Sequence, residues 1–81
     1  DISLNPVNKR IAGALLELSE GGEEVLLPMT KGDLASHLGI TQETLSRRLA
    51  ALQEEGLIAL EGHRRINIKN RPGLEKISQR S

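Results

Sequence analysis

The chain has 81 residues, with 11 basic and 11 acidic side chains, and it contains no Cys, Phe, Tyr or Trp. This length predicts one small domain over residues 1–81. The missing cysteines exclude disulfides and thiolate metal sites, and the missing aromatics argue against single-strand binders that stack bases. The zero net charge leaves no overall basic footprint for nucleic acid, so a basic patch must come from uneven placement.

A helix and a short strand are expected before residue 30. Asn5-Pro6 is a typical helix start, because Asn caps helices and Pro is tolerated at the first helical position. Apolar residues then recur at helical spacing, at Val7, Ile11, Leu15 and Leu18. The helix should end near Ser19-Glu20, because Gly21-Gly22 breaks it. The apolar run from Val25 to Leu27 predicts a brief strand.

Two closely spaced helices follow. Thr30, with Asp33 three residues later, resembles a capping box and opens a helix that Gly39 ends. Thr41 caps the next helix, which ends at Gly56. The inner stripe of this second helix is formed by Leu45, Leu49 and Leu52. Two helices joined by a few residues around a glycine form a helix-turn-helix.

The apolar pattern changes to strand-like alternation after residue 56. Two short runs flank a turn at Gly62, with apolar residues at Ile58, Leu60, Ile66 and Ile68. They predict a β-hairpin, and a last short helix is expected from Asn70 to Ile77. A hairpin directly after a helix-turn-helix is a wing. The sequence therefore predicts a mainly α fold with a small β-hairpin (α+β), a winged helix-turn-helix, with the helix-turn-helix at about 30–55 and the wing at about 57–69.

The outer face of the second helix of this motif carries the candidate base contacts. Because the leucine stripe points inward, four polar residues share the exposed face: Gln42, Glu43, Ser46 and Arg47. An arginine can pair with guanine through two hydrogen bonds, and a carboxylate can accept from a cytosine amino group. An ordinary surface ion pair between Glu43 and Arg47, four residues apart, is the alternative interpretation, and the two can coexist.

Hydroxyl and basic side chains around this face are the candidate contacts to the DNA backbone. They are Thr30, Lys31, Thr41, Thr44, Arg48, His63, Arg64 and Arg65. A simple cap at Thr30 and a solvated turn at the wing are the alternatives. The charge distribution agrees with backbone contact, since residues 61–71 carry four basic and one acidic side chain, whereas residues 1–30 carry two basic and five acidic ones.

The segment from Met29 to Ile58, MTKGDLASHLGITQETLSRRLAALQEEGLI, closely resembles the C-terminal domain of the Crp–Fnr family of bacterial transcription regulators. The most specific part is the Glu-Thr-x-Ser-Arg motif at residues 43–47, which looks most like the Fnr-like branch, and the resemblance extends over nearly all of the chain. It implies that Glu43, Ser46 and Arg47 read bases and that Gln42 is a variable specificity position. Two residues depart from the family's pattern. Arg48 stands where an apolar residue is usual, and Gln42 stands where the cyclic-AMP-responsive member has Arg, so a shared operator is not implied.

The resemblance implies a function and a set of partners. The chain would be the output domain of a transcription regulator that binds a palindromic operator in double-stranded DNA, within a cytoplasmic homodimer. RNA polymerase is a further implied partner, through the acidic turn at Glu20, Glu23 and Glu24, for which a solvated loop is the alternative. The chain does not begin with Met, and we expect it to be the tail of a longer protein whose sensor domain precedes it. The effector of that sensor domain, the operator sequence and the sign of regulation stay undetermined.

Two other classes of function are weighed against DNA binding. A winged helix used as a protein-interaction module fits the neutral charge, but such a surface is more often apolar or aromatic at its centre. No Ser, His and third group have a spacing that suggests nucleophilic catalysis, so an enzyme is not expected. The chain offers two His and no Cys, which does not assemble a metal site, and no cofactor is expected in this domain. No apolar run is long enough to predict a membrane span.

Overall fold

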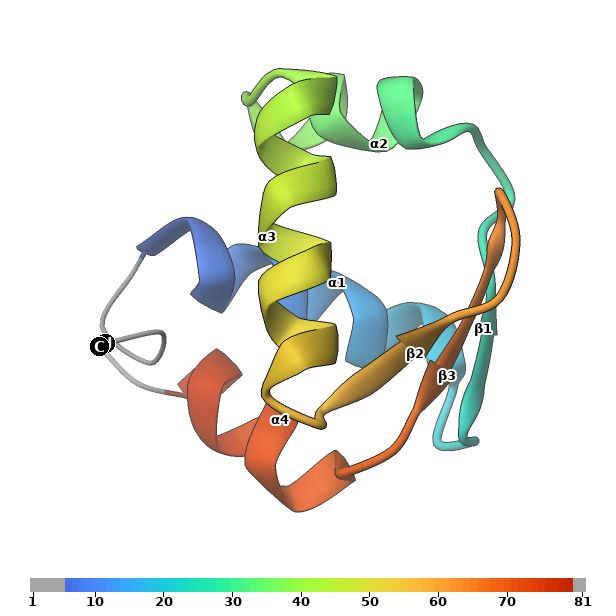
Figure 1. The fold of residues 1–81 in the computed structure, drawn as a ribbon, viewed down its shortest axis with the longest axis vertical. Helices are drawn as coiled ribbons and strands as arrows, with labels where there is room; N and C mark the ends of the chain where they lie inside the picture. Colours follow the sequence, from blue (N-terminus) through green and yellow to red (C-terminus); the bar gives the residue numbers. More distant parts are fainter. Residues whose placement is uncertain (1–5, 80–81) are drawn as a thin grey trace.

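The computed structural model describes residues 6–79, and within that range it contains four helices and one three-stranded antiparallel sheet (Figure 1). In chain order the elements are α1 (Pro6–Ser19), β1 (Glu24–Leu26), α2 (Lys31–Leu38), α3 (Gln42–Glu54), β2 (Ile58–Leu60), β3 (Arg65–Ile68) and α4 (Arg71–Gln79). The predicted order of elements is confirmed. The last helix begins one residue later and ends two residues later than predicted, and the expected cap at Asn5 lies outside the described residues.

Local hydrogen bonds place the ends of the helix-turn-helix. The Thr30 hydroxyl accepts from the backbone N–H of Asp33 at 3.1 Å, which caps α2. The Thr41 hydroxyl accepts from the N–H of Thr44 at 3.0 Å, which caps α3. Gly39 ends α2 with a left-handed φ of 74°, a conformation that glycine adopts without strain. Both helices therefore begin where the sequence predicts, separated by a three-residue turn.

The core is aliphatic and receives side chains from all seven elements. The predicted inner stripe of α3 is its centre, since Leu45, Leu49 and Leu52 are all fully buried. On the opposite side of the core, α1 packs against α4. In Figure 1, α2 lies across the N-terminal end of α3, and the sheet lies to one side of both. The N-terminal turns of α2 and α3 are thus held at the surface by a core that lies beneath them.

The sheet has the order β1-β3-β2, so the early strand joins the hairpin as its third strand. Val25 of β1 and Leu60 of β2 both lie opposite Ile66 of β3. Because β1 runs antiparallel to β3, Glu24 lies opposite Asn67, at the end of the sheet away from the hairpin turn. The acidic turn that precedes β1 is therefore distant from the basic end of the hairpin.

Two hydrogen bonds fix the wing relative to α3 and to the connection that leads into α2. The N–H of Leu27, in the connection from β1 to α2, donates to the Arg64 carbonyl at 2.8 Å. The N–H of Leu60 in β2 donates to the Gln53 side-chain carbonyl of α3 at 2.7 Å. The hairpin turn is closed by the N–H of Glu61, which donates to the Arg65 carbonyl at 2.9 Å. The fold is a winged helix-turn-helix whose wing is bonded both to α3 and to the connection that leads into α2.

Replacing Gly73 with alanine is expected to lower the free energy of unfolding by about 1–3 kcal/mol, although alanine favours helices. A Cβ at residue 73 would lie 2.8 Å from Leu57 Cδ2 and 2.8 Å from Asn70 Nδ2. Asn70 also caps α4, because its side-chain oxygen accepts from the Gly73 N–H at 3.1 Å. Gly13→Ala in α1 is the matched control, because a Cβ there meets nothing within 4 Å. Urea unfolding followed by circular dichroism should show Gly73→Ala destabilised and Gly13→Ala slightly stabilised; equal stability of the two variants would contradict this account.

Candidate nucleic-acid interface

The four candidate base contacts lie together on the outer side of α3. Gln42, Glu43, Ser46 and Arg47 are all exposed, whereas the leucine stripe on the other side of the helix is fully buried. These four residues are called the exposed α3 face below. They occupy the first two turns of the helix, which is the end that enters the major groove in helix-turn-helix complexes. The geometry that the sequence predicts for this face is present.

Glu43 and Arg47 form an ion pair within the exposed α3 face. Arg47 Nη2 donates to Glu43 Oε2 at 3.0 Å, and each side chain is 74% exposed. A pair this exposed contributes little to folding, because water screens the two charges and both side chains lose rotamer freedom. The surface ion pair that the alternative interpretation expects is therefore present, and both side chains remain accessible to a ligand.

Replacing Glu43 with glutamine is expected to change the free energy of unfolding by less than about 0.5 kcal/mol. The physical reason is the exposure of the pair, which leaves Arg47 fully hydrated once its partner is neutral. Urea unfolding of the variant and of the parent chain measures the difference. A loss greater than about 1 kcal/mol would mean that the pair is part of the folding energetics instead of an accessible surface feature.

Three further candidate residues flank this face: the N-cap of α3, Thr41, and two residues within α3, Thr44 and Arg48. The Thr41 hydroxyl donates to Thr44 Oγ1 at 2.9 Å while it accepts from the Thr44 N–H. The two hydroxyls are therefore engaged with each other at the helix start, with Thr41 exposed and Thr44 half-buried. Arg48 is also half-buried, which agrees with a side chain whose stem partly covers the core edge. These residues lie at the border of the exposed α3 face.

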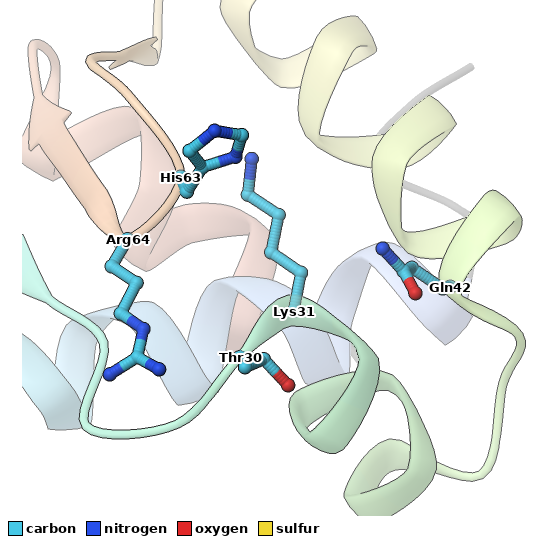
Figure 2. Close-up of a pocket in the computed structure, with 5 residues that line it drawn as sticks. All are labelled: Thr30, Lys31, Gln42, His63 and Arg64. Carbon is cyan, nitrogen blue, oxygen red and sulfur yellow. The ribbon is translucent and has the colours of Figure 1, made fainter.

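A notch of about 320 Å³ lies between the first turns of α2 and α3 and the tip of the wing (Figure 2). It is lined by Thr30, Lys31, Gln42, His63 and Arg64. Figure 2 shows the Lys31 side chain extending beside His63, with Arg64 next to His63 in the turn between β2 and β3. Lys31 and Arg64 contribute two positive charges, and the lining contains no carboxylate. Three segments that are far apart in the sequence thus form one electropositive concavity, whose charge and shape suit a phosphate group.

Arg65 lies apart from the notch. Although it follows Arg64 directly, it belongs to β3, and its Nε lies 3.5 Å from Glu24 Oε2 on β1. Arg65 is paired in register with Leu26, two residues beyond Glu24, so the ion pair is a diagonal contact across the two strands. The structure therefore brings His63 and Arg64 together with the helix-turn-helix and directs Arg65 toward the sheet.

Sequence reasoning missed that Gln42 belongs both to the exposed α3 face and to the notch. Its helical position predicts an exposed base contact, but the structure also places it in the notch beside Lys31. The available signal was that Lys31 and Gln42 are the first residues of two helices joined by a three-residue turn. That turn joins the end of α2, a helix of only eight residues, to the start of α3, so the angle between the helices decides whether the two helix starts and their side chains meet.

Other classes of site are not found in the part of the chain that the structure covers. Over residues 6–79, none of the helices combines the length and apolar character that crossing a membrane requires. In the same range, His, Asp and Glu side chains do not gather in groups of three or more that could hold a metal ion.

Comparison with known proteins gives a consistent family assignment. The family model described as a Crp-like helix-turn-helix domain matches residues 9–77. The chain is 42% identical over 72 residues to the nitrogen fixation regulation protein FixK of Rhizobium meliloti (strain 1021), covering 85% of this chain and 34% of the relative. It is 32% identical over 84 residues to the fumarate and nitrate reduction regulatory protein of Escherichia coli K12, covering 95% of this chain and 33% of that protein.

Solved structures agree with this assignment. FixK2 from Bradyrhizobium japonicum superposes with a TM-score of 0.82 and 32% identity, covering 93% of this chain and 39% of that one. A putative transcriptional regulator of the crp/fnr family from Eubacterium rectale superposes with a TM-score of 0.80 and 34% identity, covering 98% of this chain and 36% of that one. The chain spans between 33% and 39% of the length of these relatives, which are described as regulators of nitrogen fixation, of fumarate and nitrate reduction or of transcription.

Proposed function

The chain belongs to the family of Crp-like helix-turn-helix domains, and on that premise we propose that it is the sequence-specific DNA-binding output domain of a transcription regulator. The observation that carries the proposal is the exposed α3 face, which is polar, held in place by a buried leucine stripe, and bordered by the electropositive notch. The absence of any apolar side chain among its four residues disfavours a protein-interaction module, which would present an apolar or aromatic centre.

In the proposed mechanism, the N-terminal half of α3 enters the major groove and reads base edges. Arg47 forms two hydrogen bonds to guanine, Glu43 accepts from the amino group of a cytosine or adenine, and Ser46 contacts a neighbouring base or phosphate. The ion pair between Glu43 and Arg47 holds both side chains above the same part of the face before DNA arrives. Gln42, at the first position of α3, reads a further base at the edge of the half-site.

The backbone contacts in this proposal lie on either side of α3. Thr30, Lys31, His63 and Arg64, which line the notch, bind phosphate oxygens there. Thr41, Thr44 and Arg48 follow the strand along the border of the exposed α3 face. Arg65 binds a phosphate only if its side chain moves away from Glu24, with which it is paired at 3.5 Å. Such contacts fix the register of the protein on the duplex, so that base contacts can select the sequence.

We further propose the assembly in which the domain acts. The full-length protein would be a homodimer in the bacterial cytoplasm, with a sensor domain that precedes this domain and binds an effector. A twofold dimer reads a palindromic operator with half-sites roughly 34 Å apart, one helical turn of DNA. The acidic turn at Glu20 and Glu23 is exposed and lies away from the wing tip, so it would remain free to contact RNA polymerase.

DNA binding itself is tested by adding the chain to a fluorescently labelled duplex of about 30 base pairs at several salt concentrations. The same titration is made with one strand of that duplex alone. We expect a preference for the duplex and an affinity that falls as salt rises, with a shallow slope because few cationic side chains (Lys31, Arg48 and Arg64) are placed to neutralise phosphates. Equal binding to the single strand, or no binding to the duplex at low salt, would contradict the proposed function.

A further inference from the structure

Gly32 occupies a helical position that does not require glycine for its backbone. It is the second residue of α2, and it is not among the described glycines with a positive φ, which are Gly21, Gly39, Gly56 and Gly62. Within a helix, glycine is less favourable than alanine because the flexible backbone loses more entropy. A reason for glycine at residue 32 must therefore come from the space beside it.

That space is occupied by the Gln42 side chain. A Cβ at residue 32 would lie 3.1 Å from Gln42 Oε1 and 3.7 Å from Gln42 Cδ. Figure 2 shows the Gln42 side chain extending from the start of α3 toward the start of α2. The bare Cα of Gly32 thus leaves room for the Gln42 amide to lie against the first turn of α2. Although Gln42 is exposed to solvent, its amide lies in the space that a side chain at residue 32 would occupy.

We propose that Gly32 is a specificity-determining residue that acts through Gln42. The missing side chain at residue 32 sets where the Gln42 amide lies, and thereby which base edge or phosphate the amide reaches when α3 is in the groove. This inference rests on the proposed function and deepens it, because it assigns part of the sequence preference to a residue on α2 that does not itself reach a base.

The substitution Gly32→Ala isolates this effect because the neighbour is the far end of a flexible side chain. The added methyl group displaces the Gln42 amide, whereas the backbone of α2 keeps its conformation. The variant should therefore fold at least as stably as the parent chain. Gly13→Ala is the matched control: it also adds a methyl group to a helical glycine, but a Cβ at residue 13 meets nothing within 4 Å.

The positioning is tested first without DNA, from the side-chain NH₂ signals of Gln42 in amide nitrogen–proton NMR spectra. We expect Gly32→Ala to shift these signals and Gly13→Ala to leave them unchanged. Signals that do not move in Gly32→Ala would overturn the inference. Because this readout needs no ligand, it is informative even if the duplex titration described above fails.

The effect on specificity is tested by measuring affinities for duplexes that differ at single positions of the preferred half-site. Gly32→Ala should change the ratio of affinities for two such duplexes roughly two- to tenfold, which is part of the discrimination that one base contact provides. The change should occur at the same base pair that Gln42→Ala affects. Adding Gly32→Ala to Gln42→Ala should cause no further change. If either Gly32→Ala or Gln42→Ala left the base preference unaltered, the inference would be overturned. If the parent chain itself showed no base preference, the proposed function would be contradicted.

Discussion

Replacing Leu49 with alanine is expected to lower the free energy of unfolding by about 2–5 kcal/mol. Leu49 is fully buried at the middle of the inner stripe of α3, so truncation removes buried methyl groups and leaves a cavity in the core. Domains are stable by only about 5–15 kcal/mol, and a domain this small has a thin core, so the loss is a large share of the total. We expect DNA binding to weaken as well, because the exposed α3 face depends on this packing for its position.

The measurement for Leu49→Ala is urea unfolding followed by far-ultraviolet circular dichroism, since the chain has no Trp or Tyr to report by fluorescence. Glu54→Ala is the matched control, because residue 54 is exposed near the end of the same helix. The control should stay within about 0.5 kcal/mol of the parent chain. A similarly small change for Leu49→Ala would show that the leucine stripe does not hold α3 in place.

Replacing Arg47 with alanine is expected to cost about 1–3 kcal/mol of binding free energy on the preferred operator and to relax the preference at one G·C pair. The fold should be unaffected, because the Arg47 side chain is 74% exposed and its pairing with Glu43 contributes little to stability. The expected loss comes from the two hydrogen bonds that a guanidinium makes to guanine and that a methyl group cannot replace.

The control for Arg47→Ala is Arg47→Lys, which keeps the positive charge but lacks the planar fork that pairs with one base. Affinities for the preferred duplex and for a scrambled duplex should be measured for both variants. We expect Arg47→Lys to retain the affinity for scrambled DNA while losing part of the preference. Equal losses of Arg47→Ala on both duplexes would mean that Arg47 contacts phosphate and does not read a base.

The features of the fold that depend on nearby residues could be predicted from the sequence. Thr30 and Thr41 are caps because their hydroxyls reach an N–H three residues later, which is a property of the local chain. The alternation of apolar and polar residues on either side of Gly62 also predicts a hairpin, because it too is a property of the local chain. The polar composition of the exposed α3 face also follows from helical period alone, once the leucine stripe is assigned to the core.

The features that depend on distant contacts could not be predicted. The pairing of β1 with β3 joins residues about 40 positions apart, and the apolar run at residues 25–27 contains no information about its partner. Adjacency in the sequence predicts that Arg65 acts with His63 and Arg64, but the register of β1 against β3 places Glu24 beside Arg65. The notch and the contact between Gly32 and Gln42 depend on the angle between α2 and α3, which the packing of both helices decides.

Base reading by the exposed α3 face is tested by selecting bound sequences from a pool of random duplexes, with two copies of the chain joined by an added dimerising segment. We expect recovery of a palindrome with a G·C pair in each half-site, at a separation of roughly 34 Å between half-sites. The same selection with Arg47→Ala should recover a palindrome in which that G·C pair is no longer preferred. Recovery of no sequence above background at low salt would contradict the claim that the exposed α3 face reads bases.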